Sequence, residues 1–300
     1  MVNVTEICEE EYVYPGTRAC AGCSMALIMR MALKALGKNT IMTIPASCST
    51  VQTGMQGFST TKVSVLNTPF ATTGASASGI VASLESKNLD DKVTVLAFAG
   101  DGGTTDIGIQ ALSGAAERGT NFIYLCYDNE AYMNTGVQRS GSTPQFAYTT
   151  TTPKGKIMQK KDMPRIMEAH GIPYVATANA AYPLDLYEKV KKAKELGIKG
   201  TKYLHVLTPC PPGWGFDPRY TIEVGRLAVQ TGFWPLYEVI EGKLILSKDG
   251  KRYSKPEKRK PIEDYLKLQK RFSHITDVEI EAYKDYIKDL WAGIQKRLED

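Results

Sequence analysis

Residues 100–138 read GDGGTTDIGIQALSGAAERGTNFIYLCYDNEAYMNTGVQ, and this stretch decides the fold. Residues 93–99, VTVLAFA, precede it as a short apolar run rich in β-branched residues, which is typical of a strand buried on both faces. Apolar residues then recur at helical spacing, beginning with Ile107, so we expect a helix over residues 107–118 that Gly119 closes. Residues 121–127, NFIYLCY, predict a second buried strand. Strand, glycine-rich turn, helix and strand together predict a right-handed βαβ unit of a parallel sheet.

Asp101 and Asn129 directly follow these two predicted strands. Parallel neighbouring strands bring their carboxyl ends together, so we expect the two side chains to lie close to each other. With the backbone carbonyl of Ala131 they form a set of hard oxygens that suits Mg²⁺. Three glycines allow a diphosphate to approach the backbone closely: Gly100, Gly102 and Gly103. The alternative is an ordinary Rossmann-like turn, but the sequence is not GxGxxG, which disfavours dinucleotide binding.

The composition of the 300-residue chain predicts a large globular α/β protein. Apolar residues make up 43%, which is ample for one core, and the net charge of +5 is too mild and scattered for nucleic-acid binding. The acidic N-terminus lacks a signal-peptide pattern, and no apolar run is long enough to span a membrane, so we expect a cytoplasmic protein. We divide the chain into an α/β domain, residues 1–235, and a C-terminal hairpin and helical extension, residues 236–300.

Four of the six cysteines suggest a metal or redox centre, since disulfides are rare in cytosolic proteins. Cys20 and Cys23 form a CxxC pair. Cys48 and Cys210 each follow a predicted strand, so the four thiols could converge beside the cofactor edge. Zinc is one alternative, although zinc ribbons usually have two CxxC pairs, and unrelated buried cysteines are another.

The other candidate residues have simpler interpretations. Cys126 lies inside a predicted strand and reads as a buried core thiol, while Cys8 stays unassigned. None of His170, His205 and His274 has a metal-ligand spacing, and His205 reads as a satisfied core histidine.

Two motifs resemble those of a known family. The GDG motif, the following gap and the segment DNEAYMNTGVQRSGSTP resemble the β subunit of the 2-oxoacid:ferredoxin oxidoreductases, the pyruvate:ferredoxin oxidoreductase superfamily. The usual thiamine signature ends in Asn-Asn, whereas this chain has Asp128-Asn129. The segments ACAGCS and TPCPPGW, with Cys48 between them, are similar to the family's proximal 4Fe–4S ligand set.

The resemblance implies a thiamine-diphosphate-binding fold, a doubly wound and mainly parallel sheet. It implies oxidative decarboxylation of a small 2-oxoacid, with electrons passing through the 4Fe–4S cluster to ferredoxin. Asn134 is expected to face the reacting carbon as the catalytic residue, with an Asx turn as its alternative role. Three further residues are expected to contact the cofactor: Thr135, Cys48 and Ser49.

The family also implies partners. Thiamine enzymes need a carboxylate on the aminopyrimidine ring, and we find no second α/β half here. We therefore expect an α subunit that supplies a pyrimidine-binding domain with the activating Glu, and γ/δ-type ferredoxin-like subunits. The chain alone should be inactive. A non-catalytic iron–sulfur electron-transfer or scaffold subunit is the alternative.

One stretch departs from pyruvate-type members. Residues 59–79, STTKVSVLNTPFATTGASASG, have Thr, Ser and Asn67 where those members carry aromatic residues and His. A smaller, more polar pocket favours oxalate, with pyruvate next. The amphipathic helix expected over residues 277–296 is either a solvated helix or an arm that lies over a partner.

Overall fold

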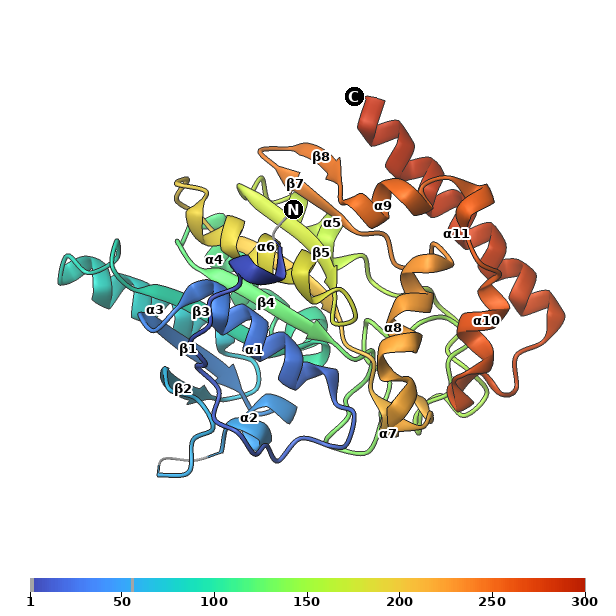
Figure 1. Cartoon of the computed structure of the whole chain (residues 1–300), viewed down its shortest axis with the longest axis horizontal. Helices are drawn as coiled ribbons and strands as arrows, with labels where there is room; N and C mark the ends of the chain where they lie inside the picture. The colour runs from blue at the N-terminus through green and yellow to red at the C-terminus, as the bar shows by residue number, and fades with distance from the viewer. Residues whose placement is uncertain (1–2, 55–56, 300) are drawn as a thin grey trace.

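One eight-stranded sheet organises the computed structural model, which describes residues 3–54 and 57–299 (Figure 1). The strand order is β2-β1-β3-β4-β6-β5-β7-β8. Strands β1 to β6 pair in parallel, while β7 pairs antiparallel with β5 and β8 pairs antiparallel with β7. The strands are β1 Thr40–Pro45, β2 Ser64–Thr68, β3 Thr94–Gly100, β4 Ile123–Asp128, β5 Tyr174–Asn179, β6 Lys202–Leu207, β7 Tyr237–Ile240 and β8 Lys243–Leu246.

Helices cover both faces of this sheet. On one face α1 packs against α6, and on the other lie α3, α4 and α5 together with the C-terminal helices. The helices are α1 Ser24–Leu36, α2 Cys48–Thr53, α3 Thr73–Ser86, α4 Ile109–Glu117, α5 Met163–Glu168, α6 Pro183–Glu195, α7 Pro211–Trp214, α8 Thr221–Gln230, α9 Lys248–Tyr253, α10 Ile262–Lys267 and α11 Asp277–Glu299. This arrangement confirms the doubly wound, mainly parallel α/β sheet that the sequence predicts.

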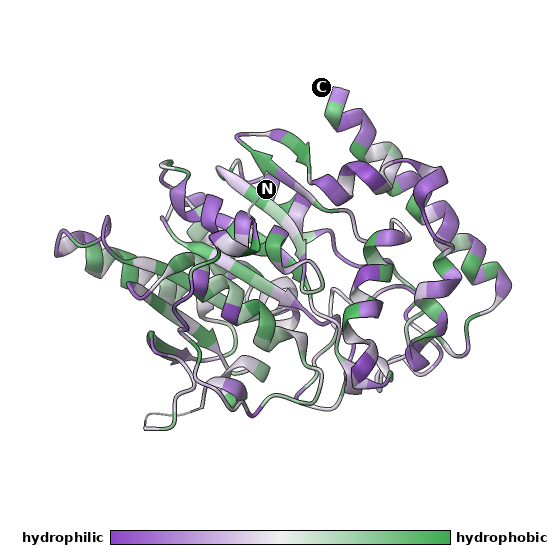
Figure 2. Ribbon diagram, in the orientation of Figure 1, coloured by the Kyte–Doolittle hydropathy of each residue, from purple (hydrophilic) through white to green (hydrophobic). Residues whose placement is uncertain are grey.

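The central strands are apolar because both of their faces are covered. Every residue of β4, β5 and β6 is buried, and their side chains divide between the two cores on either side of the sheet. In Figure 2 the central strands are largely green or white, whereas α11 alternates between purple and green along its length. The continuous apolar runs of the sequence are therefore strands of a buried parallel sheet.

The helix after the glycine-rich turn begins later than predicted. A π-helical segment, Gly102–Asp106, follows β3, and α4 starts at Ile109. Ile107 is 47% exposed, so its expected place on the buried face of a helix was wrong. A Cβ atom on Gly108 would lie 1.9 Å from the carbonyl oxygen of Gly103, so the chain folds back on itself here more closely than an α-helix with side chains allows.

The C-terminal residues belong to the same hydrophobic core as the rest of the chain. The predicted C-terminal hairpin is formed by β7 and β8. It turns at Glu241 and Gly242, both with positive φ, and β7 hydrogen-bonds to β5. Helix α11 buries Tyr283, Ile287 and Trp291 in the core that also contains residues of β3 and β4. The division at residue 235 thus separates two parts of the sequence that share one sheet.

Residues 135–160 contain neither helix nor strand, as the sequence predicts. Two isolated bridges, Tyr132 with Gln138 and Thr149 with Thr152, shape this segment. The amide of Tyr148 donates a 2.8 Å hydrogen bond to the carbonyl of Arg271, which attaches the segment to the C-terminal part of the chain.

Candidate functional site

Four adjacent parallel strands, β1, β3, β4 and β6, present their carboxyl ends at one edge of the sheet. The residues that follow them include four predicted site residues: Cys48, Asp101, Asn129 and Cys210. The register pairs Gly100 with Tyr127 and Asp128 with Leu207, so these strands end at nearly the same level. The edge is where open α/β sheets bind their ligands.

Of the three residues expected to hold Mg²⁺, Asn129 contacts both Asp101 and Ala131. Asp101 and Asn129 are buried, with 1% and 7% of their surface exposed. One terminal atom of the Asn129 carboxamide lies 2.8 Å from the carbonyl oxygen of Ala131 and 3.0 Å from Asp101 Oδ1. With nitrogen at that position both contacts are hydrogen bonds. With oxygen there, three oxygens face one another, an arrangement that a cation stabilises.

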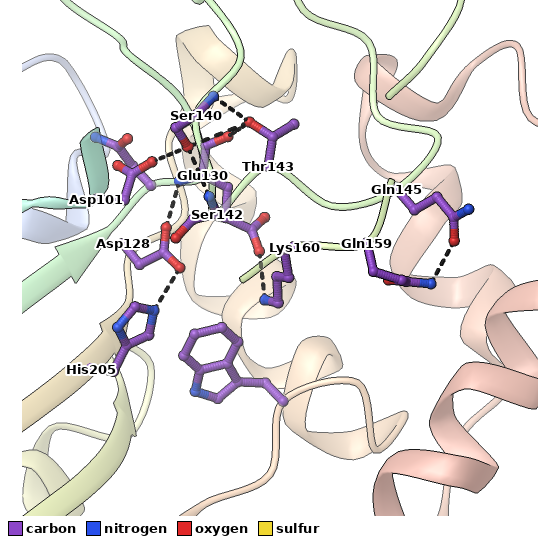
Figure 3. Close-up of polar contacts among 12 residues, drawn as sticks. Asp101, Asp128, Glu130, Ser140, Ser142, Thr143, Gln145, Gln159, Lys160 and His205 are labelled. Carbon is purple, nitrogen blue, oxygen red and sulfur yellow. Dashed lines mark hydrogen bonds and ion pairs between the residues drawn. The ribbon is translucent and has the colours of Figure 1, made fainter. Parts of the chain in front are cut away.

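The protonation of this site depends on burial and on neighbouring charges (Figure 3). Burial raises the pKa of Asp101 well above its usual value, and the nearby charge of Asp128 raises it further. The hydroxyl of Ser140 donates a hydrogen bond to Asp101 Oδ2. Burial also opposes ionisation of Asp128, but the 2.8 Å hydrogen bond with His205 Nε2 and the charge of His205 outweigh it and lower the pKa of Asp128. A bound divalent cation would favour ionised Asp101 and so reverse the effect of its burial.

Most of the predicted cofactor-binding residues line one cavity at this edge. Its wall includes Gly100, Asp101, Gly102, Gly103, Asn129, Ala131, Asn134, Thr135 and Cys48. Ser49 is the exception. It is fully buried behind this wall, and its hydroxyl lies 3.1 Å from Tyr127 Oη.

The cavity also contains aromatic residues that sequence reasoning missed. Tyr127, Tyr132 and Phe70 also line it. A Cβ atom on Gly102 would lie 2.5 Å from the Tyr132 ring, so this glycine is required by the close approach of an aromatic side chain. The hydroxyl of Tyr132 donates a 3.0 Å hydrogen bond to Asp106, which holds the ring in place. The aromatic residues at positions 127 and 132, flanking Asp128-Asn129, were the signal that could have identified them.

Asn134 and Cys48 meet at the mouth of the cavity. Asn134 is exposed in the turn after Ala131, and Cys48 Sγ donates a 3.1 Å hydrogen bond to its Oδ1. The amide of Gly136 donates to the carbonyl of Met133, not to the Asn134 side chain as an Asx turn requires. The Asn134 side chain therefore contacts Cys48 across the cavity mouth.

A second cavity adjoins the first and contains the four candidate thiols. Cys20, Cys23, Cys48 and Cys210 line it, and Cys48, Asn129, Met133 and Asn134 line both cavities. Among residues 3–54 and 57–299, no three His, Cys, Asp or Glu side chains form a group that could hold a metal ion.

Burial favours the protonated form of three thiols, those of Cys23, Cys48 and Cys210. It raises the pKa of both Cys48 and Cys210 to about 12 and raises the pKa of Cys23 as well. A metal that binds thiolates must therefore displace these protons. Cys126 is fully buried within β4, as predicted, and Cys8 lies in the N-terminal segment away from this cavity.

His205 is a satisfied core histidine, as the sequence predicts. It is buried in β6, and its two ring nitrogens lie 2.8 Å from Asp128 Oδ2 and 2.6 Å from Tyr203 Oη. Trp214, which follows Cys210 in α7, donates a 2.8 Å hydrogen bond from Nε1 to the carbonyl of Asn129. Residues 208–214, called the cysteine loop below because they contain Cys210, therefore contact the loop after β4 directly.

None of the helices described here has both the length and the apolar character that crossing a membrane requires.

Comparison with known proteins identifies the fold and the relatives of the chain. Residues 46–206 match the family "Thiamine pyrophosphate enzyme, C-terminal TPP binding domain". The chain is 51% identical to pyruvate synthase subunit PorB of Methanothermobacter thermautotrophicus, over 94% of this chain and 96% of that protein. It is 50% identical to the PorB subunit of Methanocaldococcus jannaschii, over 95% and 97% of the two chains.

Other relatives are named for different 2-oxoacids. Ketoisovalerate oxidoreductase subunit VorB of Pyrococcus furiosus is 44% identical, over 97% of this chain and 94% of that protein. Among solved structures, 2-oxoglutarate:ferredoxin oxidoreductase from Magnetococcus marinus superposes with a TM-score of 0.58 at 23% identity, over 72% of this chain and 79% of that chain. This structural likeness confirms the fold.

Proposed function

Since the chain belongs to the β subunits of the 2-oxoacid:ferredoxin oxidoreductases, thiamine-dependent oxidoreductases, we propose that it binds thiamine diphosphate through Mg²⁺ beside a 4Fe–4S cluster. The observation that carries this proposal is the position of Cys48. This residue lines both cavities and bonds to Asn134, so one side chain belongs to the cofactor site and to the thiol site at once.

The oxygen set fits Mg²⁺. Asp101 Oδ1, the Asn129 amide oxygen and the Ala131 carbonyl would be its protein ligands, since Asp101 Oδ1 and the Ala131 carbonyl oxygen each lie within 3.0 Å of the Asn129 carboxamide. Hard oxygen ligands of this kind bind Mg²⁺ together with phosphate oxygens and water. Gly100, Gly102 and Gly103 line the cavity in which the diphosphate would lie, with the rings of Tyr127, Tyr132 and Phe70 beside them.

The thiol set fits an iron–sulfur cluster better than zinc. Cys20, Cys23, Cys48 and Cys210 line one largely apolar cavity, and no three of them are close enough to hold a single ion. A four-iron cluster is an extended body whose corners each take one thiolate, so its ligands lie further apart than those of Zn²⁺. An apolar cavity also keeps water from the cluster.

When bound, thiamine diphosphate supplies the electron sink for decarboxylation of a 2-oxoacid, and the cluster accepts the electrons one at a time. The chain's own residues orient the participants. Asn134 would donate its side-chain amide to the carboxylate of the substrate. Cys48 would ligate iron as a thiolate, so cluster binding would remove the proton that Cys48 donates to Asn134 in this structure. Tyr132, Tyr127 and Phe70 exclude water from the cavity wall.

The substrate that we propose is a small 2-oxoacid, with pyruvate first, because the relatives at 50% and 51% identity are pyruvate synthase subunits. The preference for oxalate, drawn from the polar residues 59–79, stays a prediction. Phe70 from this stretch lines the cavity, so the pocket retains an aromatic wall there.

The proposed complex contains further subunits. The cavity mouth is open at Asn134 and Thr135, which are both exposed. We propose that an α subunit covers it with a pyrimidine-binding domain and the activating Glu, and that ferredoxin-like γ/δ-type subunits carry electrons from the cluster to ferredoxin in the cytoplasm. Thr135 would contact the cofactor directly, and Ser49 would act behind the wall through Tyr127.

The test is ferredoxin or viologen reduction by the purified complex, with pyruvate, 2-ketoisovalerate and oxalate compared with and without coenzyme A. Iron, labile sulfide and bound thiamine diphosphate are measured on the same sample. We expect thiamine diphosphate in the complex and rapid reduction with pyruvate. A complex that holds iron but no thiamine diphosphate would instead favour the non-catalytic electron-transfer or scaffold role. Oxalate turnover faster than pyruvate turnover would reverse the proposed substrate order.

A further inference from the structure

Arg271 is a buried cation that contacts both the loop after β4 and the loop after β6. It lies in the 3-10 helix Lys270–Phe272 with 4% of its surface exposed, although it is more than a hundred residues from the cofactor motif in sequence. Its Nη2 lies 2.7 Å from Oε2 of Glu130, whose side chain is fully buried. Removing either member would leave a buried charge with fewer partners, which is costly.

Glu130 lies between the proposed Mg²⁺ ligands Asn129 and Ala131. Its φ of +64° is in the left-handed region, which is strained for a residue with a side chain. Its amide donates a 2.9 Å hydrogen bond to Asp128 Oδ1, and its carbonyl accepts a 2.6 Å hydrogen bond from Thr143. Figure 3 shows its side chain pointing away from Asp101 toward Lys160, 3.2 Å away. Contacts to its carboxylate therefore help to hold a strained backbone that aims two metal ligands.

The same guanidinium also contacts the cysteine loop. Its central carbon lies 3.8 Å from the centroid of the Trp214 ring, a cation–π contact in a desolvated position. Trp214 in turn donates from its ring Nε1 to the carbonyl of Asn129, and its backbone amide donates a 2.9 Å hydrogen bond to the carbonyl of Cys210 at the start of α7. One face of Arg271 thus supports the cysteine loop while its edge supports the loop with the metal ligands.

Close packing leaves this junction little freedom to shift. A Cβ atom on Gly213 would lie 2.2 Å from Met133 Sδ and 3.3 Å from Cys210 Sγ, so the cysteine loop lies directly against the turn after Ala131. A Cβ atom on Gly215 would lie 2.7 Å from Lys270 Cβ, so the segment with Arg271 packs equally closely on the other side. Movement of one loop is therefore transmitted to the other.

We propose that Arg271 is a positioning residue. Through Glu130 and Trp214 it fixes the position of the loop after β4, which contains Asn129 and Ala131, relative to the cysteine loop. The proposal rests on the proposed function, since it assigns Asn129 and Ala131 to Mg²⁺ and Cys210 to the cluster. Arg271 supports both groups without touching either. Lysine could keep the charge toward Glu130 but lacks the planar group that stacks on Trp214.

The test uses the assembled complex and two measurements other than turnover. Binding of Mn²⁺ in place of Mg²⁺ is followed by loss of the free Mn²⁺ EPR signal in the presence of thiamine diphosphate. The EPR spectrum of the reduced cluster is recorded on the same samples. For Arg271→Met we expect Mn²⁺ affinity to fall roughly 10- to 100-fold, as for other residues that support metal ligands, and the cluster spectrum to change. For Arg271→Lys we expect a smaller loss.

Arg259→Met is the matched control. Arg259 also lies in the C-terminal part of the chain, stacks on a tryptophan at 4.8 Å and donates to two carbonyls, those of Tyr253 and Ser254. It does not contact the loops of the site, so its replacement should cost stability without a change in either signal. If Arg271→Met does not fold, the double variant Glu130→Gln/Arg271→Met also neutralises the buried carboxylate, which the single variant leaves with Lys160 as its ion-pair partner, and it should still lose Mn²⁺ affinity.

Two outcomes would overturn the proposal. One is a foldable Arg271 variant, single or double, whose Mn²⁺ affinity stays within twofold of wild type and whose cluster spectrum is unchanged. The other is an equal loss in Arg259→Met, which would show a general effect of destabilisation. A wild-type complex that contains neither iron nor a thiamine-dependent Mn²⁺ site would instead disprove the proposed function, and with it this inference.

Discussion

Two glycines in helix α3 give a sharp test of how this fold is packed. Gly74 lies where α3 crosses α4, and a Cβ atom there would be 2.9 Å from both the carbonyl carbon and the carbonyl oxygen of Ala111. These are backbone atoms of a helix, so they cannot move aside as a flexible side chain could. We expect Gly74→Ala to destabilise the chain by roughly 1–3 kcal/mol, the usual cost of overpacking.

Gly79 is the control in the same helix. It is exposed, and a Cβ atom there would have no heavy atom within 4 Å. Gly79→Ala gains helix propensity without a clash, so we expect it to stabilise the chain by roughly 0.5–1 kcal/mol. The two variants, identical in chemistry and five positions apart in one helix (74 and 79), should therefore differ by roughly 1.5–4 kcal/mol.

Urea unfolding followed by tryptophan fluorescence measures this difference. All three tryptophans, Trp214, Trp234 and Trp291, are at least 95% buried, so their emission should report loss of the core. Coincidence with the far-UV circular dichroism transition checks two-state behaviour. Equal stabilities for the two variants, or a Gly74→Ala protein more stable than wild type, would refute the close α3–α4 packing on which the reasoning depends.

Four further changes test the site. Asn134→Ala in the complex should leave thiamine diphosphate binding within about twofold of wild type and lower kcat by roughly tenfold or more, as expected for loss of an interaction made during turnover; unchanged kcat would remove Asn134 from the reaction. Gly102→Ala should weaken thiamine diphosphate binding by roughly tenfold, because its Cβ would lie 2.5 Å from the Tyr132 ring, and calorimetric titration would show a normal affinity if that contact is unimportant. Cys23→Ser should lower the iron content of the purified complex, and full iron retention would contradict its assignment as a ligand. Burial lowers the pKa of Lys156 to about 8, so the ammonium group of Lys156 loses its proton at a lower pH in the folded chain than in the unfolded chain. Stability relative to a Lys156→Met variant should therefore rise between about pH 8 and 10, and a pH-independent difference in unfolding free energy would count against this burial effect.

The local pattern of the sequence was enough for the class of fold and for placing most of the candidate residues at one edge of the sheet. Apolar runs of five to seven residues bounded by glycine identify buried parallel strands, and the residue after each strand lies at the binding edge by geometry alone. Asp101, Asn129 and Cys48 could be placed at this edge in this way, because the position of a strand end requires no knowledge of distant contacts. The alternation of strands and helices likewise predicted the doubly wound sheet.

Long-range packing decided the rest. The π-helical segment before α4 and the exposure of Ile107 follow from a backbone approach between Gly103 and Gly108 that no periodicity reveals. Ser49 faces Tyr127 and not the cavity, because the start of α2 turns it inward. Arg271 contacts Glu130 and Trp214 because the C-terminal segment packs against the loops that contain these two residues. Periodicity reports which residues are buried, whereas the partner each buried residue meets depends on the packing of distant segments, and that information exists in the tertiary structure alone.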